Sequence, residues 1–90
     1  IIIRMLNNLK TLFGSRDQWT AAWKVQRRLA LLKPGSWRER RDLAILTLRA
    51  GRPGEAAILL EDCIRVCTIP ERPVLQHHLR QAQQLIPQFN

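Results

Sequence analysis

Two cysteines and two histidines are the residues of this sequence best suited to chemistry. Cys63 and Cys67 are four residues apart, which on a helix places both side chains on one face. That spacing differs from the C-x-x-C of redox and zinc sites, so we interpret both thiols as small apolar core side chains. His77 and His78 are adjacent and would project about 100° apart on a helix, too far to face one metal ion in the usual one-turn geometry. We therefore predict no metal site.

Catalytic arrangements have little support in the sequence. Cys67 and His77 have the residue types of a nucleophile and its base, but no third group that would orient the histidine stands out. Glu61 and Asp62 are neighbours that point in different directions from a helix, as surface charges do. We predict no catalytic residue and no cofactor, and a chain whose task is binding.

The excess of positive charge is the main clue to a partner. The 90 residues include 15 Lys and Arg against 7 Asp and Glu, for a formal net charge of +8. Such a charge attracts nucleic acid, an anionic membrane surface or an acidic protein, although a solvated basic exterior explains the same composition. No apolar run approaches the about 20 residues that cross a bilayer, and no signal peptide is visible. We expect an intracellular protein of the cytoplasm or an organellar stroma and, because the chain begins at Ile1, part of a longer polypeptide.

Three tryptophans among the arginines raise the alternative of base stacking with single-stranded nucleic acid. Trp19 and Trp23 are one helical turn apart, which fits packing inside a helical hairpin better, whereas Trp37 suits either role. No motif that reads nucleic acid accompanies them.

The positions of these residues are governed by a repeat of 34 residues. Sliding the sequence by that offset places apolar residues on apolar residues. The matched pairs are Leu9 with Leu43, Leu12 with Leu46, Ala22 with Ala56, Val25 with Leu59, Leu29 with Cys63 and Leu32 with Val66. A period of about 34 residues is typical of the tetratricopeptide helical hairpin, which buries its apolar face by stacking on the next hairpin.

Helical spacing and turn residues define the first hairpin. Apolar residues at steps of three and four predict a helix over about 3–13, ended by Gly14 and Ser15. Asp17 is the expected N-cap of a second helix that continues to Pro34.

The second hairpin begins with a capping-box pattern. Ser36 should accept from the backbone amide of Glu39, whose side chain should reach back to the start of the helix. Gly51 predicts a left-handed stop, and Pro53 suits the first position of the next helix.

We therefore predict an all-α fold of two tetratricopeptide-like hairpins followed by a capping helix. Repeat 1 covers about 3–36 and repeat 2 about 37–70. The segment over about 73–86 has one apolar and one glutamine-rich face, as a helix that shields the last hairpin requires.

Individual residues add a closer resemblance. Trp19, Ala22, Gly51 and Ala56 occupy positions where the tetratricopeptide pattern places an aromatic, a small residue, a turn glycine and a small residue. The heptad R-M-L-N-N-L-K at 4–10 and further stretches in the same order are similar to the C-terminal tetratricopeptide region of the SirB1 family of transglutaminase-like proteins. That resemblance implies an upstream papain-related domain, which would supply any Cys-His chemistry, and a helical tail that binds partners or contacts that domain.

The expected function is a non-catalytic protein-interaction module. In tetratricopeptide stacks the first helix of each hairpin lines a concave groove, where guanidinium groups can bind carboxylates in two-point fashion. The expected partner-binding residues are Arg4, Asn7, Asn8, Arg38, Arg41 and Arg49. They would form a basic groove for an acidic peptide or protein; alternatively, Arg41 and Asp42 form only a local ion pair. The second candidate is a basic helical repeat that binds nucleic acid.

Overall fold

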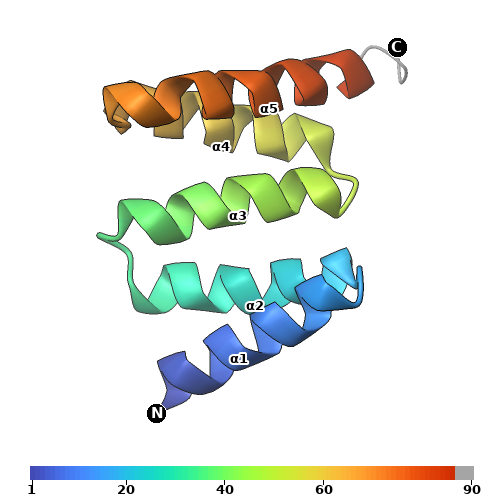
Figure 1. Cartoon of the computed structure of the whole chain (residues 1–90), viewed down its shortest axis with the longest axis vertical. Helices are drawn as coiled ribbons and strands as arrows, with labels where there is room; N and C mark the ends of the chain where they lie inside the picture. The colour runs from blue at the N-terminus through green and yellow to red at the C-terminus, as the bar shows by residue number, and fades with distance from the viewer. Residues whose placement is uncertain (87–90) are drawn as a thin grey trace.

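The computed structural model describes residues 1–86, which form five α-helices joined by short turns and contain no strand (Figure 1). Helices α1 (Ile2–Ser15) and α2 (Trp19–Leu32) make one antiparallel hairpin, and α3 (Trp37–Arg49) and α4 (Pro53–Val66) make another. A 3₁₀ turn, η1 (Ile69–Glu71), leads into α5 (Arg72–Leu85). In Figure 1, α1 runs diagonally below α2 and passes in front of it near their shared turn, and α4 lies behind α5. The predicted all-α fold of helical hairpins with a terminal helix is confirmed.

The turn between α3 and α4 ends its helix as predicted. Gly51 has a φ of 82°, in the left-handed region that glycine adopts without strain. The N–H of Gly51 donates to the carbonyl of Leu48, and the N–H of Arg52 to that of Thr47, both at 3.1 Å. These two bonds make a Schellman stop, which satisfies carbonyls that the helix end leaves free. Pro53 then occupies the first turn of α4, where its missing N–H costs nothing.

The turn between α1 and α2 repeats this geometry 34 residues earlier in the chain. Asp17, the residue that corresponds to Gly51, has a φ of 55°. The N–H groups of Asp17 and Gln18 donate to the carbonyls of Gly14 and Phe13 at 3.2 and 2.9 Å. The N-cap role predicted for Asp17 is therefore wrong: Asp17 lies in the left-handed turn, and Gln18 is the residue that precedes α2.

The start of α3 forms only half of the predicted capping box. Ser36 Oγ accepts from the N–H of Glu39 at 3.4 Å, as expected. The Glu39 side chain does not reach back, because its carboxylate accepts from Gln26 Nε2 at 3.1 Å and the Ser36 N–H donates to the Lys33 carbonyl instead. Gln26 also donates to the Glu39 carbonyl at 2.9 Å and is fully buried, so this side chain ties α2 to α3.

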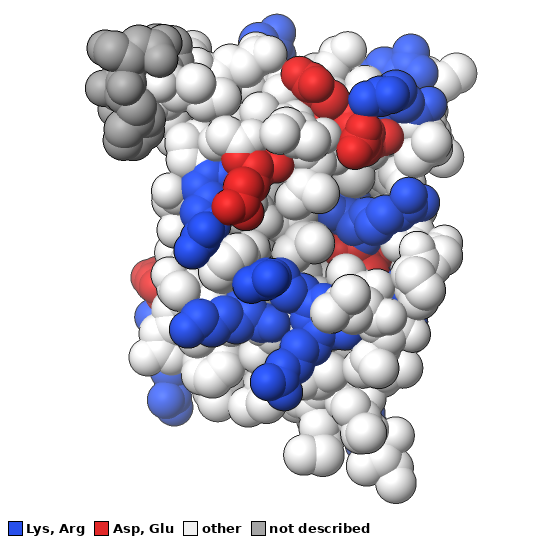
Figure 2. All heavy atoms as spheres, turned by 180° about the vertical axis from the view of Figure 1, so that it is seen from behind, with Lys and Arg blue, Asp and Glu red and all other residues white. Residues whose placement is uncertain are grey.

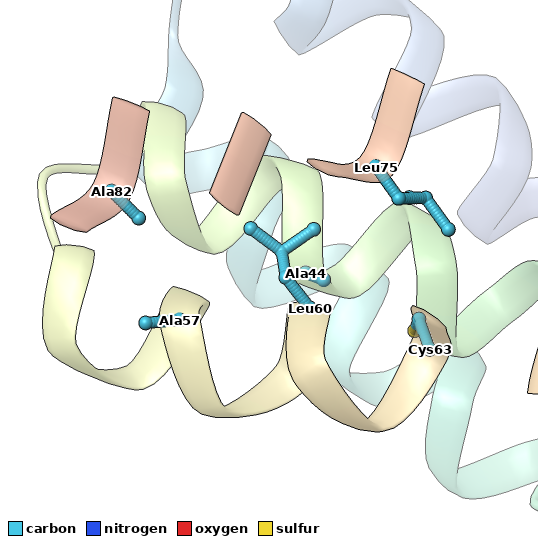
Figure 3. Close-up of a cluster of buried hydrophobic side chains, with 6 residues drawn as sticks. All are labelled: Ala44, Ala57, Leu60, Cys63, Leu75 and Ala82. Carbon is cyan, nitrogen blue, oxygen red and sulfur yellow. The ribbon is translucent and has the colours of Figure 1, made fainter. Parts of the chain in front are cut away.

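A cluster of buried apolar side chains lies between α3, α4 and α5 (Figure 3). Its buried members are Ala44, Ala57, Leu60, Cys63, Leu75 and Ala82. Half of these are alanines, whose short side chains allow the helices to approach closely. Ala22 and Ala56, at the small-residue positions of the tetratricopeptide pattern, are fully buried in α2 and α4.

Helix α1 differs from the other four because none of its residues is buried. It also runs on through Gly14 and Ser15, which were expected to end it. Leu9 and Leu12, two members of the 34-residue pattern, are 39% and 42% exposed. The apolar stripe of α1 is thus only partly covered by α2.

Candidate functional site

A groove crosses the face formed by α1, α3 and the start of α5. Its first hollow, of about 240 Å³, is lined by Lys10, Thr11, Asp42, Ile45 and Leu46. Its second hollow, of about 340 Å³, is lined by Arg41, Asp42, Ile45, Pro70, Glu71, Val74 and Leu75. The two hollows adjoin, because Asp42 and Ile45 line both of them, and we call them together the α1–α3–α5 groove.

A chain of ion pairs runs across the middle of this groove. Asp42 accepts from Lys10 Nζ at 3.4 Å and from Arg41 Nε at 3.2 Å. Arg41 also donates to Glu71 at 2.8 Å, and the second oxygen of Glu71 accepts from Thr68 at 3.2 Å. The local Arg41–Asp42 pair, considered from the sequence as the alternative, is therefore present and extends to a second carboxylate.

These contacts further stabilise the charged form of Arg41. Partial burial alone would lower its pKa, but the charge of Asp42, the hydrogen bonds to Asp42 and Glu71, and the charge of Glu71 outweigh that effect and raise the pKa above its ordinary value. The Arg41 guanidinium also lies over the Trp37 ring, 5.2 Å from the ring centroid. Arg41 is consequently held in place by three neighbours.

Of the six residues expected from the sequence to bind a partner, Arg41 alone lines the two hollows. Arg38 is exposed and lies one turn before Arg41 and Asp42 on α3, so it shares their face. Arg49 lies one turn after Ile45, and its guanidinium packs over the Trp19 ring at 4.8 Å. Both arginines thus extend the α3 side of the groove at its two ends.

The expected α1 residues continue the other side of the groove. Arg4 and Asn8 are exposed and lie one or two turns before Thr11 on the helix. Asn7 is half-buried, and its amide donates to the Ile3 carbonyl at 3.1 Å, which occupies one of its two N–H groups. Arg4 and Asn8 are therefore more available to a partner than Asn7.

Two charged residues of the groove, Lys10 and Glu71, were missed by sequence reasoning. Lys10 closes the same heptad that contains Asn7 and lies three residues beyond it, so helical spacing could have identified it. Glu71 lies in η1, a turn that apolar periodicity does not predict, and no sequence signal pairs it with Arg41.

The tryptophans serve mainly as packing residues. Trp23 is 5% exposed, which confirms its predicted place in the core, and Arg27 and Arg52 lie over its ring at 4.9 and 4.3 Å. Trp37 is half-buried, packs against the α3–α4–α5 cluster and donates through Nε1 to the Cys63 carbonyl at 3.4 Å.

The cysteines and histidines do not assemble into a site in the described part of the chain. Cys63 is buried, as predicted, and burial raises the pKa of its thiol; Cys67 is only partly buried. The His77 and His78 rings lie 5.9 Å apart on α5. Across residues 1–86, no three His, Cys, Asp or Glu side chains gather in a way that could hold a metal ion.

Charge is unevenly distributed over the molecule. Eight of the 15 Lys and Arg residues, but only one of the 7 Asp and Glu residues, occur in residues 1–38. In Figure 2, which shows the molecule from behind, basic side chains gather over α2, and most acidic ones lie nearer the α4 and α5 end. Within the described residues, no helix is long and apolar enough to cross a membrane.

Comparison with known proteins agrees with this geometry. The sequence profile described as tetratricopeptide repeat matches residues 9–86, which include the second half of α1 and all the later helices. Searches of curated proteins and of solved structures found no match. The profile spans far more than half of the chain, and the antiparallel hairpins repeat their turn geometry at the 34-residue period of that family. The chain belongs to the tetratricopeptide repeat family.

Proposed function

We propose that this chain is a non-catalytic protein-interaction module whose α1–α3–α5 groove binds an acidic segment of a partner protein. Tetratricopeptide repeats generally mediate protein–protein interaction, and their stacked helices create extended concave surfaces. The observation that supports this proposal most directly is that the two hollows adjoin and share Asp42 and Ile45 as lining residues.

The composition of the groove favours an acidic segment that also carries an apolar residue. Ile45 and Val74 offer an apolar surface beside the central ion pairs. The basic side chains on the walls are Arg4, Lys10, Arg38, Arg41 and Arg49, against the acidic Asp42 and Glu71. This excess of positive charge attracts carboxylates, and arginine binds them in a two-point geometry.

The internal ion pairs divide the groove into a neutralised centre and basic ends. Lys10 and Arg41 already face Asp42 and Glu71, so an incoming carboxylate gains less there. Within the described residues, Arg38 forms no ion pair, and Arg49 contacts the Trp19 ring rather than a carboxylate. We therefore expect the acidic residues of the partner to lie at the two ends, with its apolar residue on Ile45.

Selection from a random peptide-display library tests this proposal. Enriched peptides should carry an apolar residue flanked by Asp or Glu, and Arg38→Glu with Arg49→Glu, one change at each basic end, should weaken the best of them about a hundredfold or more, since each charge-assisted bond contributes about 1.5–3 kcal/mol. Arg65→Glu with Arg80→Glu, an equal charge change at exposed positions of α4 and α5, is the matched control and should change affinity little. Unchanged binding by a double variant with a wild-type circular dichroism spectrum would rule out the groove.

Nucleic-acid binding is the other candidate, favoured by the basic side chains over α2 in Figure 2. Measuring the affinity for a single-stranded oligonucleotide at several salt concentrations distinguishes the two candidates. The logarithm of the affinity for phosphates falls linearly with the logarithm of the salt concentration, whereas apolar contacts with Ile45 persist at high salt. Nucleic-acid binding would be favoured over peptide binding in the groove if the chain bound the oligonucleotide tightly and no peptide were enriched. That oligonucleotide binding should depend strongly on salt and be abolished by Lys24→Glu with Arg27→Glu.

The similarity to the SirB1 family supports a further part of the proposal. We infer that the chain is the helical tail of a transglutaminase-like protein, because residues 4–10 carry the heptad that resembles that family. Both cysteines are free, which is compatible with a reducing intracellular compartment. The full-length coding sequence tests the inference: a papain-related domain encoded upstream supports it, and an unrelated upstream domain contradicts it.

A further inference from the structure

The outer face of α1 is an apolar surface that the described residues leave uncovered. Ile2, Met5, Leu9 and Leu12 are 65%, 58%, 39% and 42% exposed. Their spacing of three, four and three residues forms one straight row on a helix, about 15 Å long. Such a row is the pattern through which one helix packs on another.

The two ends of the stack differ in this respect. At the other end, α5 covers α4 with Leu75 and Ala82 and turns glutamines such as Gln76, Gln83 and Gln84 to solvent. At the α1 end the outward row is apolar. The outward face of α5 is therefore mainly polar, although Val74 and Leu85 are 56% and 40% exposed, whereas the outward face of α1 is apolar and open to a further helix.

A hollow beside this row extends the apolar surface onto α2. Its volume is about 300 Å³, and it is lined by Ile2, Leu6, Arg28, Leu31 and Leu32. Leu31 and Leu32 are 80% and 50% exposed, so the hollow opens to solvent. It lies at the N-terminal end of α1, away from the α1–α3–α5 groove.

Positive charge borders the same face. Arg28 lines the hollow, and Lys24 lies one turn earlier on α2. Arg16 follows directly after α1, and within residues 1–86 none of these three cations forms an ion pair. Asp17 is the only acidic residue in residues 1–38, so the border carries no balancing row of carboxylates.

We propose that the outer face of α1, with the adjoining hollow, docks an amphipathic helix of a partner protein that carries acidic residues beside its apolar stripe. The straight apolar row selects a helix, and the Lys24–Arg28 border selects acidic flanks. A second copy of this chain fits less well, because pairing like faces would bring two basic borders together. This surface is distinct from the groove, and the proposal does not depend on what the groove binds.

A library of displayed helical peptides tests the proposal. The peptides share a leucine stripe at 3–4 spacing, and their flanking positions are randomised between Glu and Lys. Glu-flanked members should be enriched, and Met5→Glu should weaken the best of them about tenfold or more. Ile58→Glu is the matched control, because Ile58 is 65% exposed on α4 and the same change should leave affinity unaltered.

Charge exchange provides the second arm. Lys24→Glu with Arg28→Glu should lose the Glu-flanked peptide and gain the Lys-flanked one, whereas Arg38→Glu in the groove should change neither. Met5→Glu and the charge variants replace exposed side chains, so their melting temperatures should stay near that of the wild type, which separates lost binding from lost folding. Three results would each overturn the proposal. The first is equal enrichment of Glu-flanked and Lys-flanked peptides, and the second is a dimer in sedimentation equilibrium that Met5→Glu dissociates. The third is that the chain binds phosphatidylserine vesicles and none of the helical peptides.

Discussion

Gly51 offers the sharpest test of the repeat geometry. Its φ of 82° is a conformation that costs an L-residue about 1–2 kcal/mol. A Cβ added at Gly51 would meet no atom within 4 Å, so Gly51→Ala imposes this backbone cost without a steric clash. A loss of about 1–2 kcal/mol should lower the melting temperature by about 4–16 °C for a domain of this size.

Thermal unfolding followed by circular dichroism measures this loss. Gly35→Ala is the matched control, because a Cβ there also meets no atom within 4 Å and the backbone does not require a left-handed φ. The control should melt at or slightly above the wild-type temperature. Asp17→Gly should not lower stability, because glycine adopts the φ of 55° at no steric cost. If Gly51→Ala and Gly35→Ala melt together, the left-handed stop does not hold the second turn and the repeat geometry is wrong.

Three further predictions concern the core. Ala22→Leu and Ala56→Leu should each cost about 1–3 kcal/mol in urea titrations by overpacking fully buried positions, and unchanged stability of both would contradict the hairpin register. Gln26→Leu should cost about 1–3 kcal/mol because it leaves the Glu39 carbonyl and carboxylate without their buried donor; a stabilised variant would argue against that bond. Burial raises the pKa of the Cys63 thiol, so the unfolded chain loses this proton at a lower pH than the folded chain does. The contribution of this thiol to the free energy of unfolding is therefore fully present below the ordinary thiol pKa of about 8.5 and is lost as the pH rises through the raised pKa. Urea titrations across that range should show a smaller fall for Cys63→Ala, and an identical fall would contradict the assignment.

Local patterns and the 34-residue offset together predicted much of the fold. Gly51 and Pro53 have residue types with strong backbone preferences, so their places could be read directly. Asp17 suits both an N-cap and a left-handed turn, and local propensity alone favoured the wrong role. Its correspondence with Gly51 at the repeat offset was the signal that could have resolved the ambiguity.

Tertiary partners explain what the sequence did not reveal. Glu39 has the residue type and position of a capping box, but the buried Gln26 amide competes for its carboxylate. Gln26 corresponds at the 34-residue offset to Leu60, which is also fully buried, and this match could have identified it as a core position. The Arg41–Glu71 pair joins α3 to a 3₁₀ turn that has no periodic signature, so no local pattern could predict it.

Nuclear magnetic resonance mapping of the peptide selected by display tests the groove most directly. With the isotope-labelled chain, we predict that an acidic peptide shifts the amide signals of Thr11, Ile45 and Val74, which lie on the groove walls of α1, α3 and α5. Shifts confined to the opposite face, at Lys24 on α2 and Ile58 on α4, would contradict the assignment of the groove as the partner-binding site.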